Sequence, residues 1–357
     1  MSSDLAIDLE HVAKTYGGLF RKKTPALRGI EMRVHRGEVF GLLGPNGAGK
    51  STLVKILMTV IRPSRCSGSM LGGRVGHKPT LGRVGYLPEH HAFPGYLSGA
   101  QVIDFFGAMA GVPRRERRRR SDELLELVGM TDWAKRKLRS YSKGMRQRIG
   151  IAQALVNNPE LILLDEPTDG VDPVGRRDIR DVLQRLKDEG RTVFINSHLL
   201  SELEMVCDRV AILVKGVVAQ QGTIDELTEG QRGYLIRVAE TDDATNLLRE
   251  ALPKTSRQLP PPEADPLAKR AGFRGLLPSG ESIEIDRNVL RLGLTEPEQI
   301  QPIVDEIRRR AGVIDEIRAI RPSLEDLFMQ AVTDPTTGEA LTPGAANKSQ
   351  IAQESGR

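Results

Sequence analysis

An eight-residue glycine-rich segment limits the possible folds of this 357-residue chain more than any other feature. It reads Gly44-Pro45-Asn46-Gly47-Ala48-Gly49-Lys50-Ser51 and fits the P-loop pattern. A short apolar run at residues 39–43 precedes it, and apolar residues recur at helical spacing over residues 53–60 behind it. The segment therefore predicts a buried strand, a tight loop and a helix, in that order.

This order of elements is suited to holding phosphates. The glycines let successive backbone N–H groups face a phosphate, and the helix N-terminus adds its partial positive charge. Lys50 can reach the β- and γ-phosphates of a nucleotide, and the Ser51 hydroxyl can ligate Mg²⁺. The predicted nucleotide-binding residues are Gly44, Pro45, Asn46, Gly47, Ala48, Gly49, Lys50, Ser51 and Thr52.

Two further apolar runs, at residues 161–164 and 192–195, also end in polar side chains. Asp165 and Glu166 follow the first run, and His198 stands just behind the second. Helical patterns separate the runs, which indicates an α/β fold with a mainly parallel sheet. Because such sheets bind ligands at the carboxyl ends of their strands, we expect the P-loop, the carboxylates and His198 to surround one site.

The two adjacent carboxylates favour hydrolysis over kinase chemistry. Asp165 can hold Mg²⁺ through its water shell, and Glu166 can orient or deprotonate an attacking water. Two solvent-facing acids that end a strand are the simpler interpretation of such a pair standing alone. Behind a P-loop, the catalytic interpretation is favoured.

The character of the chain changes after residue 228. Strand patterns at residues 234–238, 283–285 and 289–294 alternate with helical patterns near 243–252 and at 297–310. We therefore predict a small α+β domain over residues 229–332. Residues 333–357 are rich in small and polar side chains, which predicts a disordered tail.

The segment Tyr141-Ser142-Lys143-Gly144-Met145-Arg146-Gln147-Arg148 lies 23 residues before the carboxylates and opens a helical pattern. Here the chain resembles the ABC ATPase family, whose signature motif, usually Leu-Ser-Gly-Gly-Gln, occupies this position. Ser142 and Gly144 match that motif, whereas Tyr141, Lys143 and Met145 depart from it. The resemblance implies an ABC ATPase domain over residues 1–228, with a mixed sheet and a helical subdomain at about 89–158.

The resemblance also assigns several single residues. Asp172 resembles the D-loop aspartate, His198 the switch histidine, and Tyr16 the aromatic residue that stacks on adenine. Glu89 stands where the family typically has glutamine, so it adds a negative charge near the expected Mg²⁺ and is a further possible metal ligand. Glu166 and His198 are the expected catalytic residues, and Ser51 and Asp165 the expected Mg²⁺ ligands.

The family works as a dimer that closes head to tail around two ATP molecules. Each ATP lies between one subunit's P-loop and the other subunit's signature residues, here Ser142, Lys143, Gly144 and Met145. The resemblance thus implies a homodimer or a paired ABC ATPase, with ATP and Mg²⁺ as cofactors. It also implies a separate membrane permease. The second domain and the signature segment resemble those of bacterial exporter subunits, and the alternative is a domain that only stiffens the dimer or regulates it.

Composition decides less about function. The chain has 52 basic and 47 acidic side chains. Six of its arginines lie at residues 114–120 on an expected helix. They form either a solvated helix face or a contact for lipid, a partner or RNA. No run approaches the roughly 18 apolar residues of a membrane span, and a signal-peptide pattern is not found, so we expect a cytoplasmic protein on the inner face of the cell membrane. Cys66 and Cys207 are interpreted as packing residues.

Two alternatives remain. Some ABC ATPases act on ribosomes or nucleic acid without a permease, but these usually carry two ATPase domains or a long coiled coil, whereas this chain has one P-loop and no sustained heptads. Binding of nucleic acid is therefore not expected. A regulatory module that senses nucleotide without turnover is disfavoured because both Glu166 and His198 are present.

Overall fold

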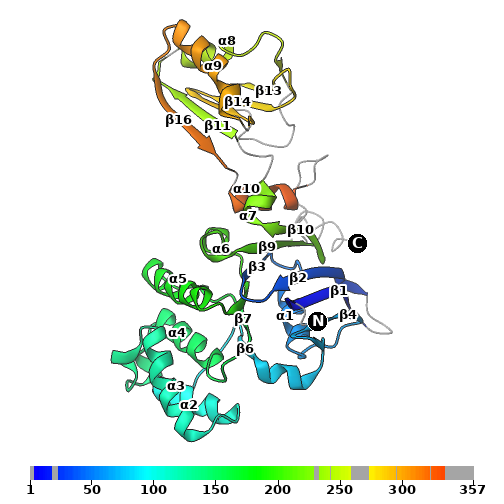
Figure 1. The fold of residues 1–357 in the computed structure, drawn as a ribbon, viewed down its shortest axis with the longest axis vertical. Coiled ribbons are helices and arrows are strands. Elements are labelled where there is room, and N and C mark those ends of the chain that lie inside the picture. Colours follow the sequence, from blue (N-terminus) through cyan, green and yellow to red (C-terminus); the bar gives the residue numbers. More distant parts are fainter. Residues whose placement is uncertain are drawn as a thin grey trace, which may run out of the picture. The chain divides into compact units, whose positions relative to one another are not determined.

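The computed structural model describes residues 4–17, 23–228, 233–241, 243–258, 273–294, 296–321 and 323–333. They form two compact units, one extending to Ile224 and the other beginning at Asp225 (Figure 1). The sequence predicted this boundary after residue 228, slightly beyond the structural one. The predicted disordered tail lies outside the described residues except for Thr333.

A six-stranded sheet in the order β10-β9-β3-β8-β7-β6 forms the centre of the first unit. All its neighbouring strands are parallel except β9 and β10. Every residue of β3, β7 and β8 is buried, as expected for parallel strands covered on both faces. The predicted α/β class with a mixed sheet is confirmed. The strands are β3 (Val39–Leu43), β6 (Val84–Leu87), β7 (Leu161–Asp165), β8 (Thr192–Asn196), β9 (Arg209–Val214) and β10 (Val217–Thr223).

A second, antiparallel sheet in the order β2-β1-β4-β5 shares a hydrophobic core with the central sheet and helix α1. In this core the rings of Phe40 and Phe194 stack with centroids 5.8 Å apart. Cys207 is buried, but Cys66 on β4 is exposed, so the prediction that both cysteines are packing residues is wrong for Cys66. The strands are β1 (Leu5–Tyr16), β2 (Thr24–His35), β4 (Arg65–Met70) and β5 (Gly73–Arg74).

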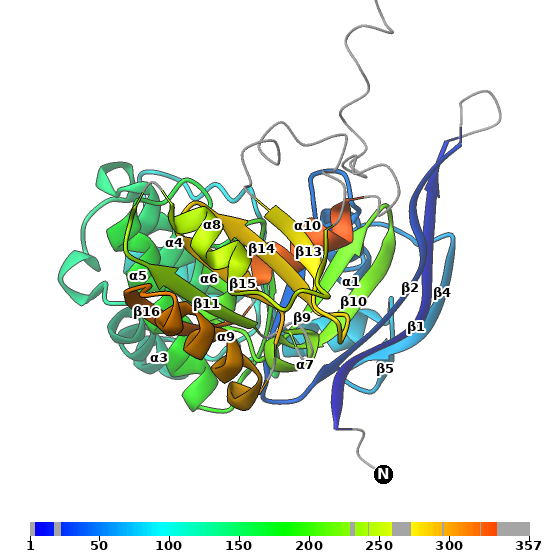
Figure 2. The ribbon, with the colours of Figure 1, turned by 90° about the horizontal axis from the view of Figure 1, so that it is seen from above.

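Helices α2, α3 and α4 pack on one another within residues 89–158, on the side of the first unit away from β1, β2 and β4 (Figures 1 and 2). The helices of this unit are α1 (Lys50–Leu57), α2 (Gly99–Met109), α3 (Arg114–Leu127), α4 (Lys143–Ala154), α5 (Pro173–Asp188) and α6 (Leu200–Val206), with α7 (Ile224–Thr228) at the boundary. Three short 3₁₀ segments are η1 (Lys78–Arg83), η2 (Thr131–Trp133) and η3 (Leu138–Ser140).

The arginine-rich segment forms the first half of α3 and has a partly structural role. Arg117 donates to Asp104 on α2 at 2.8 Å, and Arg120 donates to the Leu155 carbonyl behind α4 at 2.8 Å. Arg119 pairs with Glu116 and Glu123 on its own helix. Half of the cluster therefore joins α3 to its neighbours or pairs along the helix surface.

The second unit is a six-stranded antiparallel sheet in the order β12-β13-β14-β15-β11-β16, with α8 and α9 packed on one face. The strand patterns at 234–238, 283–285 and 289–294 and the helical patterns are all present, although β15 ends at Leu292; β12, β13 and β16 were not predicted. The elements are β11 (Gly233–Val238), α8 (Ala244–Glu250), β12 (Arg257–Gln258), β13 (Phe273–Leu276), β14 (Ser282–Asp286), β15 (Val289–Leu292), α9 (Pro297–Arg309), β16 (Ile314–Ile320) and α10 (Leu324–Val332). Within the described ranges, no helix has the length and apolar character needed to cross a membrane.

Candidate nucleotide-binding site

The P-loop connects β3 to α1, and its glycines are required by the local geometry. Gly49 is the N-cap of α1 with a φ of 112°, and a Cβ there would lie 2.7 Å from the Ala26 carbonyl oxygen. A Cβ on Gly44 would lie 2.4 Å from the Leu213 carbonyl oxygen. The loop therefore lies so close to these two neighbouring segments that only glycine fits at these positions.

The Lys50 side chain folds back onto the start of the P-loop. Its Nζ donates to the Gly44 carbonyl oxygen at 2.6 Å, and the residue is only 6% exposed. Burial lowers the pKa of Lys50, while the nearby charges of Glu166, Asp165 and Glu89 oppose that shift. The ammonium group is thus held at the mouth of the loop with acidic groups around it.

A cavity of about 200 Å³ lies at this point. Its walls include Glu89 and Glu166 from outside the P-loop, so the structure brings three of the predicted motifs around one space. The P-loop residues that line it are Pro45, Asn46, Gly47, Gly49, Lys50, Ser51 and Thr52.

Asp165 is the last residue of β7 and is 2% exposed. The parallel register places it beside Asn196 of β8, whose amide donates to one Asp165 carboxylate oxygen. Burial raises the pKa of Asp165, and the carboxylates of Glu89 and Glu166 raise it further, while the Asn196 hydrogen bond opposes them. A cation beside these acids would stabilise their charged forms and so lower the pKa of Asp165.

This arrangement fits a magnesium ion shared with a nucleotide. Mg²⁺ is usually bound by one or two protein oxygens together with phosphates and waters. The described residues contain no group of three or more His, Cys, Asp or Glu side chains that could hold a metal by themselves. Ser51 and Asp165 would be its protein ligands, and Glu89 also lines the cavity.

Glu166 adopts the left-handed backbone region, with a φ of 51°, and is 9% exposed. Its N–H donates to the Asn196 carbonyl oxygen at 2.8 Å, and the Gln147 side chain donates to its carbonyl oxygen at 3.2 Å. Its Oε2 lies 2.8 Å from His198 Nδ1 and accepts from the His198 N–H at 3.3 Å. An uncommon conformation held by so many contacts is typical of functional positions.

The signature residues begin α4. The Ser142 hydroxyl caps this helix by accepting from the Met145 N–H at 3.2 Å. The partial positive charge of the helix N-terminus would still attract an anion. Lys143 extends over Gly170 and pairs with Asp169 at 3.0 Å, which lowers the pKa of Asp169. In this chain the signature segment therefore contacts the loop that follows Glu166.

Asp172 and Tyr16, like Asp165, His198 and the signature residues, do not line the cavity. Asp172 is the N-cap of α5 and accepts from the Gly175 N–H at 2.9 Å. Tyr16, at the end of β1, is 40% exposed and does not line the cavity; the Lys14 ammonium lies 5.0 Å from its ring centroid.

Sequence reasoning missed the roles of Asn196 and Gln147 and the contact between Asp169 and Lys143. Asn196 could have been found, since it ends a parallel strand next to the strand that ends in Asp165. Gln147 and Asp169 act through contacts between distant segments, for which the sequence carries no local signal.

The site can be compared with known proteins. The family model described as ABC transporter matches residues 27–169. The daunorubicin resistance ATP-binding protein DrrA3 of Streptomyces coeruleorubidus is 34% identical over 336 residues, which cover 93% of this chain and 97% of that protein. The doxorubicin resistance ATP-binding protein DrrA of Mycobacterium tuberculosis is 34% identical over 346 residues, covering 96% and 97%.

Solved structures of ABC transporter cassettes are also similar to this chain, over about the length of its first unit. The dimeric structure of MJ0796, a bacterial ABC transporter cassette, is 26% identical with a TM-score of 0.55 and covers 61% of this chain and 98% of its own. A post-hydrolysis structure of MJ0796 bound to ADP and Pi is 25% identical, with the same score and coverage. Because relatives at 34% identity span nearly all of the chain, it belongs to the ABC transporter ATP-binding proteins and is an ATPase of that family.

Proposed function

We propose that this ATPase works as a head-to-tail dimer at the cytoplasmic face of the cell membrane and drives export through a separate permease. The observation that carries the catalytic part is the cavity at the P-loop, where Lys50 faces Glu166 and Glu89 across the position expected for phosphates. Lys50 would offset phosphate charge, and the backbone N–H groups of the loop would bind the phosphate oxygens.

Glu166 would orient the attacking water and accept its proton, and His198 would hold the Glu166 carboxylate in place. Ser51 and Asp165 would hold Mg²⁺, which supplies charge stabilisation to the phosphates when bound. Glu166 and Ser51 line one cavity, and His198 lies within hydrogen-bond distance of Glu166.

The dimer is supported by the position of the signature residues. Ser142 and Lys143 are exposed at the start of α4 and do not line the P-loop cavity of their own chain. MJ0796, which is similar over the first unit, was solved as a dimer. A second copy would bring these residues to the nucleotide.

The permease contact is supported by an apolar groove of about 510 Å³, which is lined by residues on both sides of Glu89 in the sequence. Phe93, Phe106 and Met109 line it, and their neighbour Phe105 is 51% exposed. Apolar surface of this kind marks a site for a protein partner. The similar proteins named for daunorubicin and doxorubicin resistance support export, with a drug-like substrate class.

Isolation from native membranes in mild detergent, followed by mass spectrometry, tests the transport part of this proposal. Recovery of a multi-span permease is the expected result, and Phe93→Asp together with Met109→Asp should abolish it while ATP binding persists. Recovery of ribosomes or nucleic acid instead of a permease would favour the alternative function and overturn the export proposal.

A further inference from the structure

The sheet of the second unit has one apolar face and one charged face. Apolar side chains that include Ile236, Ile285 and Leu290 share a core with α8 and α9. Because side chains alternate along a strand, the residues between them lie on the opposite face. That face carries most of the ionic contacts of the sheet.

The register places a row of five residues across this charged face. Arg274 is opposite Glu284, which is opposite Arg291. Arg291 is opposite Leu235, which is opposite Arg318 on the edge strand. Two arginines therefore flank a single leucine.

The two glutamates paired with these arginines are each shared between two of them. Glu284 lies 2.8 Å from Arg274 and 3.7 Å from Arg291, so it serves both. Glu316 is likewise shared by Arg237 at 3.3 Å and Arg318 at 3.4 Å. Four arginines share two glutamates, and Arg291 and Arg318 remain 45% and 60% exposed.

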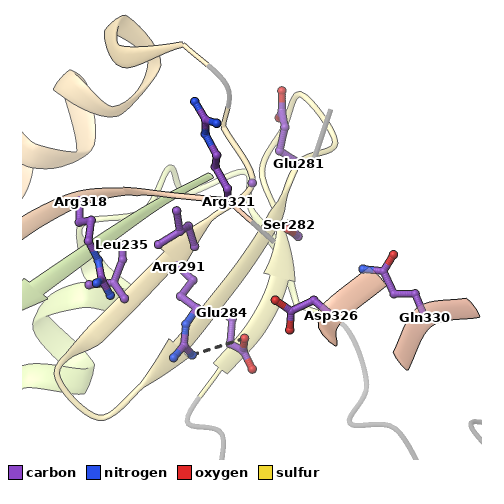
Figure 3. A pocket seen from close by; sticks show the side chains of 11 residues that line it. Leu235, Glu281, Ser282, Glu284, Arg291, Arg318, Arg321, Asp326 and Gln330 are labelled. Atoms are coloured by element: carbon purple, nitrogen blue, oxygen red, sulfur yellow. Dashed lines mark ion pairs between the residues drawn. The ribbon is translucent and has the colours of Figure 1, made fainter. Parts of the chain in front are cut away.

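Beside this row two positions of the sheet are glycine, Gly233 and Gly293. Gly293 lies next to Ser282, to whose carbonyl oxygen its N–H donates at 2.9 Å, and Gly233 is opposite Ile320. A cavity of about 910 Å³ opens over Gly293, with Leu235, Arg291, Arg318 and Ile320 in its walls. Its other charged wall residues are Glu281, Glu284, Arg321 and Asp326 (Figure 3). This volume is within the range of small-molecule sites, roughly 300–1,000 Å³.

A carboxylate oxygen of the cavity wall lacks a partner. Glu281 Oε2 is buried and accepts no hydrogen bond from any described residue. The residue as a whole is partly exposed and lines the cavity, so a bound molecule can donate to the accessible part of its carboxylate.

We propose that this hollow binds a small amphiphilic organic anion. Arg291 and Arg318 hold its carboxylate, sulfonate or phosphate group, because guanidinium groups donate paired, charge-assisted hydrogen bonds to such anions. The apolar body of the ligand lies over Gly293 between Leu235 and Ile320, and a hydroxyl or amine at its far end donates to Glu281.

The test uses the full chain and anilinonaphthalene sulfonate, whose fluorescence rises when it is bound at an apolar site. Saturable binding is expected, and the double variant Arg291→Gln/Arg318→Gln should raise its Kd by about tenfold or more, because two charge-assisted contacts are lost. The matched control Arg308→Gln/Lys254→Gln removes the same charge at exposed positions, one of them on α9, and should leave Kd within about twofold.

Equal loss in both double variants, or no loss in the first, would overturn the site. Arg318→Lys keeps the charge and the fold but loses the paired hydrogen bonds, so it should weaken binding by a smaller factor. Displacement of the dye by sulfate as readily as by an alkyl sulfonate would show that only an anion is bound, and would contradict the amphiphile. ATP turnover by the double variant should stay unchanged, which separates this result from any failure of the P-loop site.

Discussion

Glu166 illustrates how much of this site depends on single residues. Its left-handed backbone is fixed by Asn196 and Gln147, and its carboxylate is fixed by His198. The side chain can therefore face the P-loop cavity with little freedom to move. We therefore expect that replacing the carboxylate with a group of the same shape leaves the fold intact but lowers the activity.

The substitution Glu166→Gln keeps the shape and the contact with His198 but removes the proton acceptor. We expect ATP binding to persist and hydrolysis to fall by about 10²–10⁴-fold, as is usual for loss of a general base. Phosphate release in single-turnover assays measures the loss. Glu189→Gln, at an exposed surface position, is the control, and normal turnover by Glu166→Gln would refute the catalytic role.

Glu89 faces the same cavity and raises the pKa of buried Asp165 in addition to the larger effect of burial. Glu89→Gln removes one negative charge beside the expected phosphates. ATP should therefore bind at least as tightly as to the unchanged protein, with the clearest gain when Mg²⁺ is withheld. Nucleotide titration followed by fluorescence measures this, and loss of binding would contradict it.

At the scale of elements, the site depends on how β7 is anchored at its start as well as at its end. Glu160, just before β7, accepts from Arg83 at 2.7 Å and from Arg36 at 3.0 Å. These hydrogen bonds lower the pKa of Glu160 from 4.5 to about 2. They join β7 to the start of β6 and to the turn before β3, so that the strand ends bearing Asp165 and the P-loop stay aligned.

A depressed pKa in the folded state stabilises the fold above the ordinary pKa and loses that effect as pH falls. Glu160→Gln should therefore lower the free energy of unfolding at pH 7 by roughly 1 kcal/mol, a modest value because the group is partly exposed. The difference between variant and unchanged protein should shrink between pH 4.5 and about 2. Urea unfolding at several pH values measures it, and a difference independent of pH would exclude the ionic contribution.

At the scale of the whole molecule, the two units have separate hydrophobic cores. The core of the first unit joins both of its sheets to α1, and the core of the second joins its sheet to α8 and α9. No residue belongs to both of these clusters. Each unit therefore buries apolar surface of its own, which is the condition for independent folding.

A chain that ends at residue 228 should consequently fold and bind ATP. We expect one cooperative thermal transition, because a single core remains. Calorimetry and nucleotide titration of this shortened protein, alongside the full chain, check the expectation. Aggregation or loss of ATP binding would show that the second unit is needed to complete the first.

The sequence by itself determined the P-loop, the strands at its sides and the carboxylate pair. These features are recorded locally, since a glycine spacing, an apolar run or two adjacent acids need no knowledge of distant residues. For the same reason the strands of the second unit with strong patterns were predicted, while β16, whose exposed and partly buried residues alternate weakly at a sheet edge, was not.

The tertiary structure alone decided which side chains hold these motifs in place. The pairing of Lys143 with Asp169, the Gln147 contact to Glu166 and the arginine row of the second unit all join segments that are remote along the chain or on different strands. Such contacts depend on the register of strands and the approach of helices, which a single sequence does not specify. These contacts hold Glu166 beside the P-loop cavity. In the second unit, strand pairing places Arg291 and Arg318 next to Gly293 at the other cavity.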